Sequence, residues 1–177
     1  VPLLNLVDIH RQHHSSVTTL LKQSPVNADD PMALVEYIGI SNYDEAKLNS
    51  IREPHRVAYF PSSHLESDDI ELSQSFLRRF PNVTFSQSLQ DCHLYLFSKW
   101  VIDVIVAQAS ISSIKHQLVP YLVMSQRWKQ IKNEENVIAG IGVSQIQNSA
   151  MKMAHEMSHS KYNPNDLIRC FAYIAPQ

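Results

Sequence analysis

Residues 83–124 read VTFSQSLQDCHLYLFSKWVIDVIVAQASISSIKHQLVPYLVM, and this stretch decides the fold class of the chain. Its apolar spacing predicts a strand, a turn, a second strand, a helix, a short break and another helix. Residues 93–97, HLYLF, are apolar on both sides and predict a central strand that is covered on both faces. Strands followed directly by helices are typical of an α/β domain.

The two expected helices of this stretch each have one apolar face. In the first helix the face consists of Trp100, Val101, Val104 and Ile105, and in the second it consists of Ile114, Leu118, Tyr121 and Leu122. Pro120 lies inside the second helix. Because proline lacks an amide hydrogen, we expect a lost backbone bond and a bend near His116.

Upstream, the pattern predicts an amphipathic helix over residues 3–14, with Leu3, Leu6, Val7 and His10 on one face, and a strand over 16–21. A helix followed by a strand is the second half of a βαβ unit, which favours a parallel or mixed sheet and an earlier strand upstream of Val1. We therefore expect an α/β fold with a mixed, mostly parallel sheet flanked by helices, and we interpret the chain as a fragment.

Five further elements follow from the same patterns. Residues 36–41 and 56–60 are expected to form two strands of a hairpin with a long connection. A helix is expected over 71–80, with Leu72, Phe76 and Leu77 facing inward and Pro81 ending it. A polar linker over about 127–142 precedes a helix at 143–159 and a last strand at 167–175, so residues 1–177 form one partial domain.

Composition limits the classes of function. The 177 residues are 44% hydrophobic and have a formal net charge of -2, which gives no electrostatic reason to expect nucleic acid or an anionic membrane as a partner. No window approaches the roughly 18 consecutive apolar residues of a membrane span. Cys92 and Cys170 lie far apart in apolar runs, as expected for reduced thiols of a cytoplasmic protein.

The glycines give no phosphate-binding loop. Of the three glycines, only Gly140 and Gly142 lie close together, and the surrounding AGIGVSQ lacks both a third glycine and a following Lys-Ser or Lys-Thr. A linker that enters a helix explains this sequence better. From the residues we therefore predict no cofactor.

Two further motifs invite a metal. His155, Glu156 and His159 match the H-E-x-x-H pattern, in which the two histidines share a helix face and can hold zinc while the glutamate activates water. No third ligand follows at the usual spacing, so we favour a surface helix. The acidic cluster of Glu66, Asp68, Asp69 and Glu71 is better explained as residues that favour the start of a helix.

Other single residues give no site. His13 and His14, at the end of the first helix, are expected to interact favourably with its negative pole. Asp91 and His93 stand at the head of an apolar strand and invite a catalytic interpretation, but with no phosphate-binding elements they are better interpreted as strand-entry residues. No catalytic, cofactor-binding or metal-binding residue is predicted, and the surface that binds a partner stays unknown.

Several blocks of sequence, in order, resemble one protein family. They are VPLLNLVDIHRQHHSSVTTLL at 1–21, LRRFPNVTFSQSLQDCHLYLFSKWVIDVI at 77–105, SISSIKHQLVPYLV at 110–123 and LIRCFAYI at 167–174. The most specific are D-x-H-x-Y at Asp91, His93 and Tyr95 and I-x-x-x-L-x-P-Y-L-V at 114–123. Together they resemble the gamma-subunit family of eukaryotic translation initiation factor 2B.

The resemblance implies the second half of a nucleotide-sugar-transferase-like domain that is itself inactive. It also implies a structural and regulatory subunit that pairs with an epsilon subunit, and with the other subunits of the complex, and supports guanine-nucleotide exchange on translation initiation factor 2 in the cytoplasm. An alternative is an active sugar-phosphate nucleotidyltransferase, which needs a divalent metal and phosphate-binding groups. A zinc peptidase at His155 to His159 is a third and weaker alternative.

Overall fold

The computed structural model describes residues 3–24, 36–41, 54–62, 70, 72–107, 110–126 and 168–175. The helices are α1 (Leu3–Gln12), α2 (Gln74–Arg79), α3 (Lys99–Ala107), the π-helix η2 (Ile114–Leu118) and α4 (Val119–Ser125). The strands are β1 (Val17–Gln23), β2 (Ile38–Ser41), β3 (His55–Tyr59), β4 (Val83–Ser86), β5 (Leu89–Phe97) and β6 (Cys170–Ala175). Each of them overlaps a segment for which the sequence predicts the same type of element, although β1, β3 and β5 extend beyond the predicted bounds.

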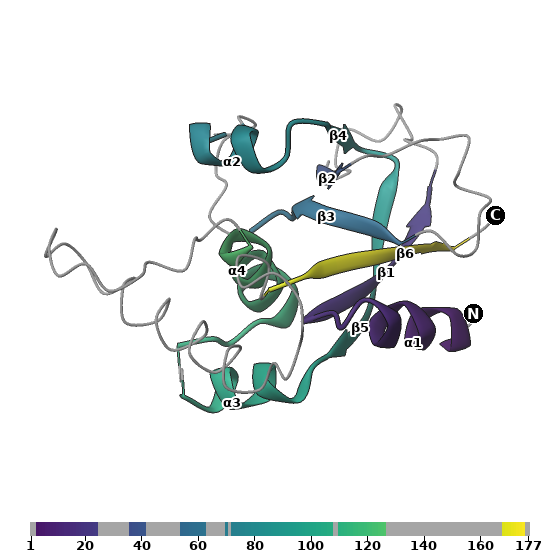
Figure 1. Cartoon of the computed structure of the whole chain (residues 1–177), viewed down its shortest axis with the longest axis vertical. Coiled ribbons are helices and arrows are strands. Elements are labelled where there is room, and N and C mark those ends of the chain that lie inside the picture. Colours follow the sequence, from purple (N-terminus) through teal and green to yellow (C-terminus); the bar gives the residue numbers. More distant parts are fainter. Residues whose placement is uncertain are drawn as a thin grey trace, which may run out of the picture.

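The strands form one sheet in the order β4-β2-β3-β6-β1-β5 (Figure 1). The expected α/β class and mixed sheet are confirmed. The expected predominance of parallel pairs is wrong, because among the described strands only β1 and β6 pair in parallel. The prediction rested on one helix-to-strand connection, from residues 3–14 to 16–21. Parallel neighbours need a long crossover, whereas β2 and β3 follow each other as an antiparallel hairpin.

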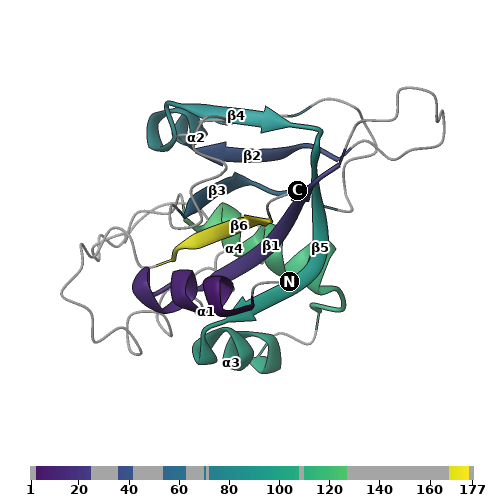
Figure 2. The ribbon, with the colours of Figure 1, turned by 90° about the vertical axis from the view of Figure 1, so that its right-hand side faces the viewer.

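The sheet is strongly curved. Its two outermost strands, β4 and β5, are joined only by Gln87 and Ser88. In a flat sheet, five strand spacings would separate these edges by about 24 Å, whereas this connection can span no more than about 11 Å. β5 therefore begins beside the end of β4, and its first residue, Leu89, already pairs with Gln23 of β1, so that β1 and β5 run side by side from there (Figure 2).

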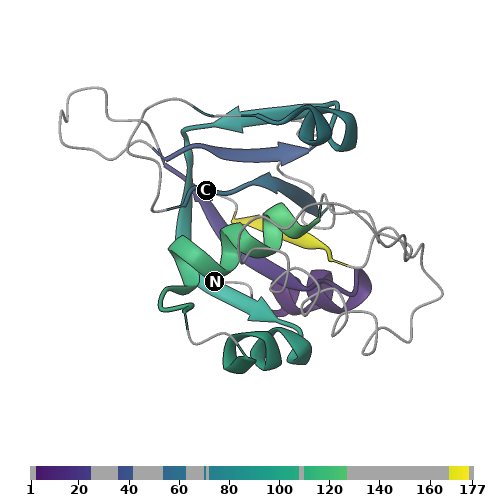
Figure 3. The same ribbon diagram turned by 90° about the vertical axis from the view of Figure 1, so that its left-hand side faces the viewer.

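Helices cover both faces of the sheet. α1 lies on one face, where Leu6 and Ile9 pack with Leu20 of β1 and Tyr173 of β6. The π-helix η2, α4 and α3 lie toward the other face (Figure 3) and form the main core with it. The buried helical residues of this core are Trp100, Val101, Val104, Leu118, Val119, Leu122 and Val123.

The main core confirms most of the expected helix faces. Leu118 and Leu122 are buried as expected, but Ile114 is exposed. In α1 the buried pair is Leu6 and Ile9, whereas Leu3 is 55% exposed. In α2 only Phe76 is buried, where it meets Phe80 and Ala58, while Leu72 and Leu77 stay on the surface.

The backbone just before Pro120 winds as a wider turn. The amides of Leu118 and Val119 donate to the carbonyls of Ser113 and Ile114, five residues earlier, so residues 114–118 wind as a π-helix. Pro120 has no amide to give to the His116 carbonyl, and its ring would collide with that oxygen in a regular α-helix. A π-turn at this position relieves the collision.

The expected central position of residues 93–97 is wrong. These residues belong to β5, which begins four residues earlier, at Leu89, and is the outermost strand of the sheet. Tyr95 and Phe97 pack against the main core, and Leu94 and Leu96 pack against the α1 side, but all four remain half-exposed. The apolar residues on both faces of β5 therefore indicate that both faces are covered. They do not indicate that β5 has a neighbouring strand on each edge.

Several predictions fall outside the described residues: the linker at 127–142, the helix at 143–159 with His155 to His159, the pair Gly140 and Gly142, and the acidic cluster from Glu66 to Glu71. Cys92 and Cys170 are both free thiols, as predicted. Within the part of the chain that the structure describes, no helix is long and apolar enough to cross a membrane.

Candidate functional site

A bulge in β5 brings together the residues of the D-x-H-x-Y motif. Thr19 pairs with Tyr95 and Leu21 pairs with Asp91, so β1 advances two residues while β5 advances four. The additional residues lie around His93, whose φ of 56° is in the left-handed region. A bulge bends a strand and increases its twist, so we expect β5 to bend between its two paired segments, at residues 89–91 and 95–97.

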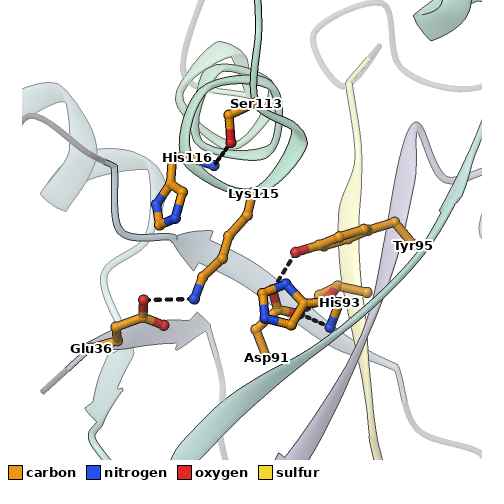
Figure 4. Close-up of polar contacts among 8 residues, drawn as sticks. Glu36, Asp91, His93, Tyr95, Ser113, Lys115 and His116 are labelled. Atoms are coloured by element: carbon orange, nitrogen blue, oxygen red, sulfur yellow. Dashed lines mark hydrogen bonds and ion pairs between the residues drawn. The ribbon is translucent and has the colours of Figure 1, made fainter. Parts of the chain in front are cut away.

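Asp91 holds the bulge together. Its carboxylate is fully buried, and Oδ1 accepts hydrogen bonds from Oγ1 of Thr19 at 3.3 Å and from the backbone amide of His93 at 3.1 Å. Oδ2 accepts a hydrogen bond from the Tyr95 hydroxyl, and Nδ1 of His93 lies 3.6 Å from the same oxygen (Figure 4). A buried carboxylate needs such donors, because burial without them would be costly.

The neighbours of Asp91 differ in exposure. The His93 side chain is 65% exposed, whereas Tyr95 is half-buried between the strand and the main core, where its ring stacks on Phe97 at 5.9 Å. Burial, together with the hydrogen bond to Asp91, raises the pKa of Tyr95 far above its ordinary value. The hydroxyl of Tyr95 therefore stays protonated and keeps donating to Asp91.

An ion pair lies next to this cluster. Nζ of Lys115 in η2 lies 2.7 Å from Oε1 of Glu36, just before β2, and both side chains are largely buried. Oγ of Ser113 accepts from the His116 amide at 3.2 Å and caps the start of η2. Figure 4 shows Lys115 reaching from the π-helix toward Glu36, with Asp91 of β5 nearby.

The polar contacts of the cluster link separate elements: β1 to β5 through Asp91, and η2 to the segment before β2 through Lys115. The oxygens of Asp91 accept from donors of the same chain, and Lys115 pairs with Glu36, so both groups have partners within the fold. Among the described residues, no group of three histidine, cysteine, aspartate or glutamate side chains could hold a metal ion.

The sequence identifies part of this cluster and misses the rest. Asp91, His93 and Tyr95 belong to the motif, and Asp91 and His93 were predicted to be strand-entry residues, but both lie inside β5. The pair of Glu36 with Lys115 carries no signal in the sequence, because the two residues meet only in the fold, and Thr19 carries a weak one. A threonine within an apolar strand is the one hint of a buried polar partner.

Two of the relatives found among curated proteins carry the same name. The translation initiation factor eIF2B subunit gamma of Dictyostelium discoideum is 29% identical over 191 residues, covering 96% of this chain and 41% of the relative. The protein of that name from Schizosaccharomyces pombe is 30% identical over 177 residues, covering 84% of this chain and 39% of the relative. The chain is a relative of the eIF2B gamma subunits.

This finding confirms the resemblance derived from the sequence blocks. The chain spans about two fifths of the length of these two relatives. No family model matches the chain.

Proposed function

We propose that this chain is part of a non-catalytic, structural and regulatory subunit of a guanine-nucleotide exchange factor that acts on translation initiation factor 2. The observation that carries the proposal is the match to two eIF2B gamma subunits over 96% and 84% of the chain. An epsilon subunit is the proposed direct partner, the other subunits complete the complex, and the exchange chemistry is assigned to a partner. The cytoplasm is the proposed location.

The geometry at Asp91 supports a scaffolding role. Thr19, His93 and Tyr95 all donate to this carboxylate, and the arrangement shapes the curved strand β5. A carboxylate that serves a phosphoryl-transfer site must leave oxygens for a metal ion or a substrate. The buried carboxylate of Asp91 instead accepts hydrogen bonds from three residues of its own chain, which supports a structural role.

Reconstitution tests the assignment of a partner. The chain that carries these residues would be co-expressed with a tagged epsilon subunit of the same organism, and the purified complex would be assayed for nucleotide release from initiation factor 2. We expect co-purification and faster nucleotide release than with epsilon alone. Failure to co-purify, with both chains folded, would overturn the proposal.

The proposed lack of catalysis has a separate test. The chain is incubated with nucleoside triphosphates and hexose 1-phosphates in the presence of Mg²⁺, and pyrophosphate release is followed. We expect release at the rate of the protein-free control. Release that depends on the chain and on the sugar phosphate would favour the nucleotidyltransferase instead.

A further inference from the structure

The C-terminal end of α1 places two histidines against the sheet. Nδ1 of His10 lies 2.9 Å from Oγ1 of Thr18, a residue of β1 that is fully buried. The His13 ring lies 5.0 Å from the ring of Phe171 in β6. Both imidazoles are half-buried between the helix and the strands.

Both sites favour the neutral imidazole. Burial lowers the pKa of His10 below its ordinary value of 6.5. Burial also lowers the pKa of His13, and the nearby charges of Arg169 and His14 lower it further. The negative pole of the helix, which the sequence led us to expect as a favourable partner, is outweighed by desolvation and by these cations.

The other ionisable groups on the packed elements do not offset these cations. Lys22 lies at the far end of β1, and Asp91 of β5 accepts from Thr19 and Tyr95. Cys92 of β5 has a pKa that burial raises, so it stays a neutral thiol at pH 7. Tyr173 of β6 accepts a hydrogen bond from Asn5 of α1. Within α1 itself, Asp8 and Arg11 are of opposite charge.

We propose that the packing of α1 on β1 and β6 is an acid-sensitive contact, in which protonation of His10 and His13 loosens the helix from the sheet. The sign follows from linkage. A histidine whose pKa is lower in the packed state binds fewer protons there, so the packed state is favoured above pH 6.5 and loses stability as the pH falls below that value. Leu6 and Ile9 supply the apolar contact that protonation must oppose.

Hydrogen exchange of the whole chain tests this contact. Protection factors are compared for the α1 amides of Ile9 and His10 and for the α4 amides of Leu122 and Val123, at pH 7.5 and at pH 5.5. We expect the α1-to-α4 ratio of protection to fall roughly threefold or more at the lower pH. An unchanged ratio would overturn the proposal.

Variants separate the two histidines from a general effect of acid. His10→Gln keeps a polar group near Thr18 and His13→Phe keeps a ring near Phe171, while neither binds a proton. The double variant should lose the pH dependence of the ratio, whereas His116→Gln, a change at an exposed histidine in η2, should retain it. A double variant that keeps the full dependence would contradict the assignment.

Direct titration keeps the test independent of how the variants fold. In the unmodified chain, the imidazole NMR signals of His10 and His13 should titrate below 6.5, the ordinary value. Titration of both signals at or above that value would overturn the proposal.

Discussion

Oγ1 of Thr19 donates to Oδ1 of Asp91 at 3.3 Å, across the two strands and at the point where their register shifts by two residues. This contact links a polar residue of the buried strand β1 to the carboxylate that organises the bulge of β5. We therefore expect the bulge of β5 to depend on the hydrogen bonds that Asp91 accepts.

Replacing Asp91 tests this dependence. Asp91→Ala removes the acceptor for Thr19, His93 and Tyr95, so we expect the free energy of unfolding to fall by about 2–4 kcal/mol. Urea denaturation gives the measurement. Asp103→Asn, on the exposed face of α3, is the control and should change stability by less than about 0.5 kcal/mol. Equal small effects would show that the carboxylate does not hold the bulge.

The left-handed conformation of His93 makes a second prediction. A β-branched side chain is strongly disfavoured at a φ of 56°, whereas glycine adopts it freely. His93→Val should therefore destabilise the chain by about 1–2 kcal/mol more than His93→Gly. Thermal unfolding of the two variants checks this order, and the reverse order would contradict the backbone conformation.

The same cluster shows how far the sequence predicts the structure. The elements themselves follow from apolar spacing, because Leu118 and Leu122 or Val101 and Val104 repeat at the helical period. The edge position of β5 does not follow from the sequence. HLYLF has the pattern of a strand with both faces covered, and this pattern is the same at the edge and at the centre of a sheet. The bulge cannot be predicted either, because nothing in the sequence marks His93 as left-handed.

Gly39 carries another relationship that depends on the sheet. It pairs with Tyr59 in β3 and with Phe85 in β4, whose rings meet at 5.6 Å. A Cβ atom at Gly39 would lie 2.8 Å from Cβ of Tyr59 and 3.1 Å from the Phe85 ring. Gly39→Ala should therefore cost about 1–3 kcal/mol through overpacking.

The control for Gly39 lies in the same strand. Ser41→Ala, at the half-buried end of β2, should cost less than about 1 kcal/mol in the same denaturation experiment. A stabilising effect of Gly39→Ala would mean that β3 and β4 lie farther apart than the structure places them.

The ion pair of Glu36 and Lys115 should have a modest effect. Lys115→Glu places two carboxylates together and should destabilise the chain by about 1 kcal/mol, and adding Glu36→Lys should recover most of this loss. The double-mutant cycle is measured at low and at high salt, because salt weakens the interaction of partly exposed charges. A double variant no more stable than Lys115→Glu would show that the two side chains do not interact.

The proposed role of the chain is that of a scaffold that binds a partner subunit. Native mass spectrometry of the chain co-expressed with an epsilon subunit tests it most directly. We expect a complex whose mass equals the sum of one copy of each chain. Detection of the two folded chains only as separate species would contradict it.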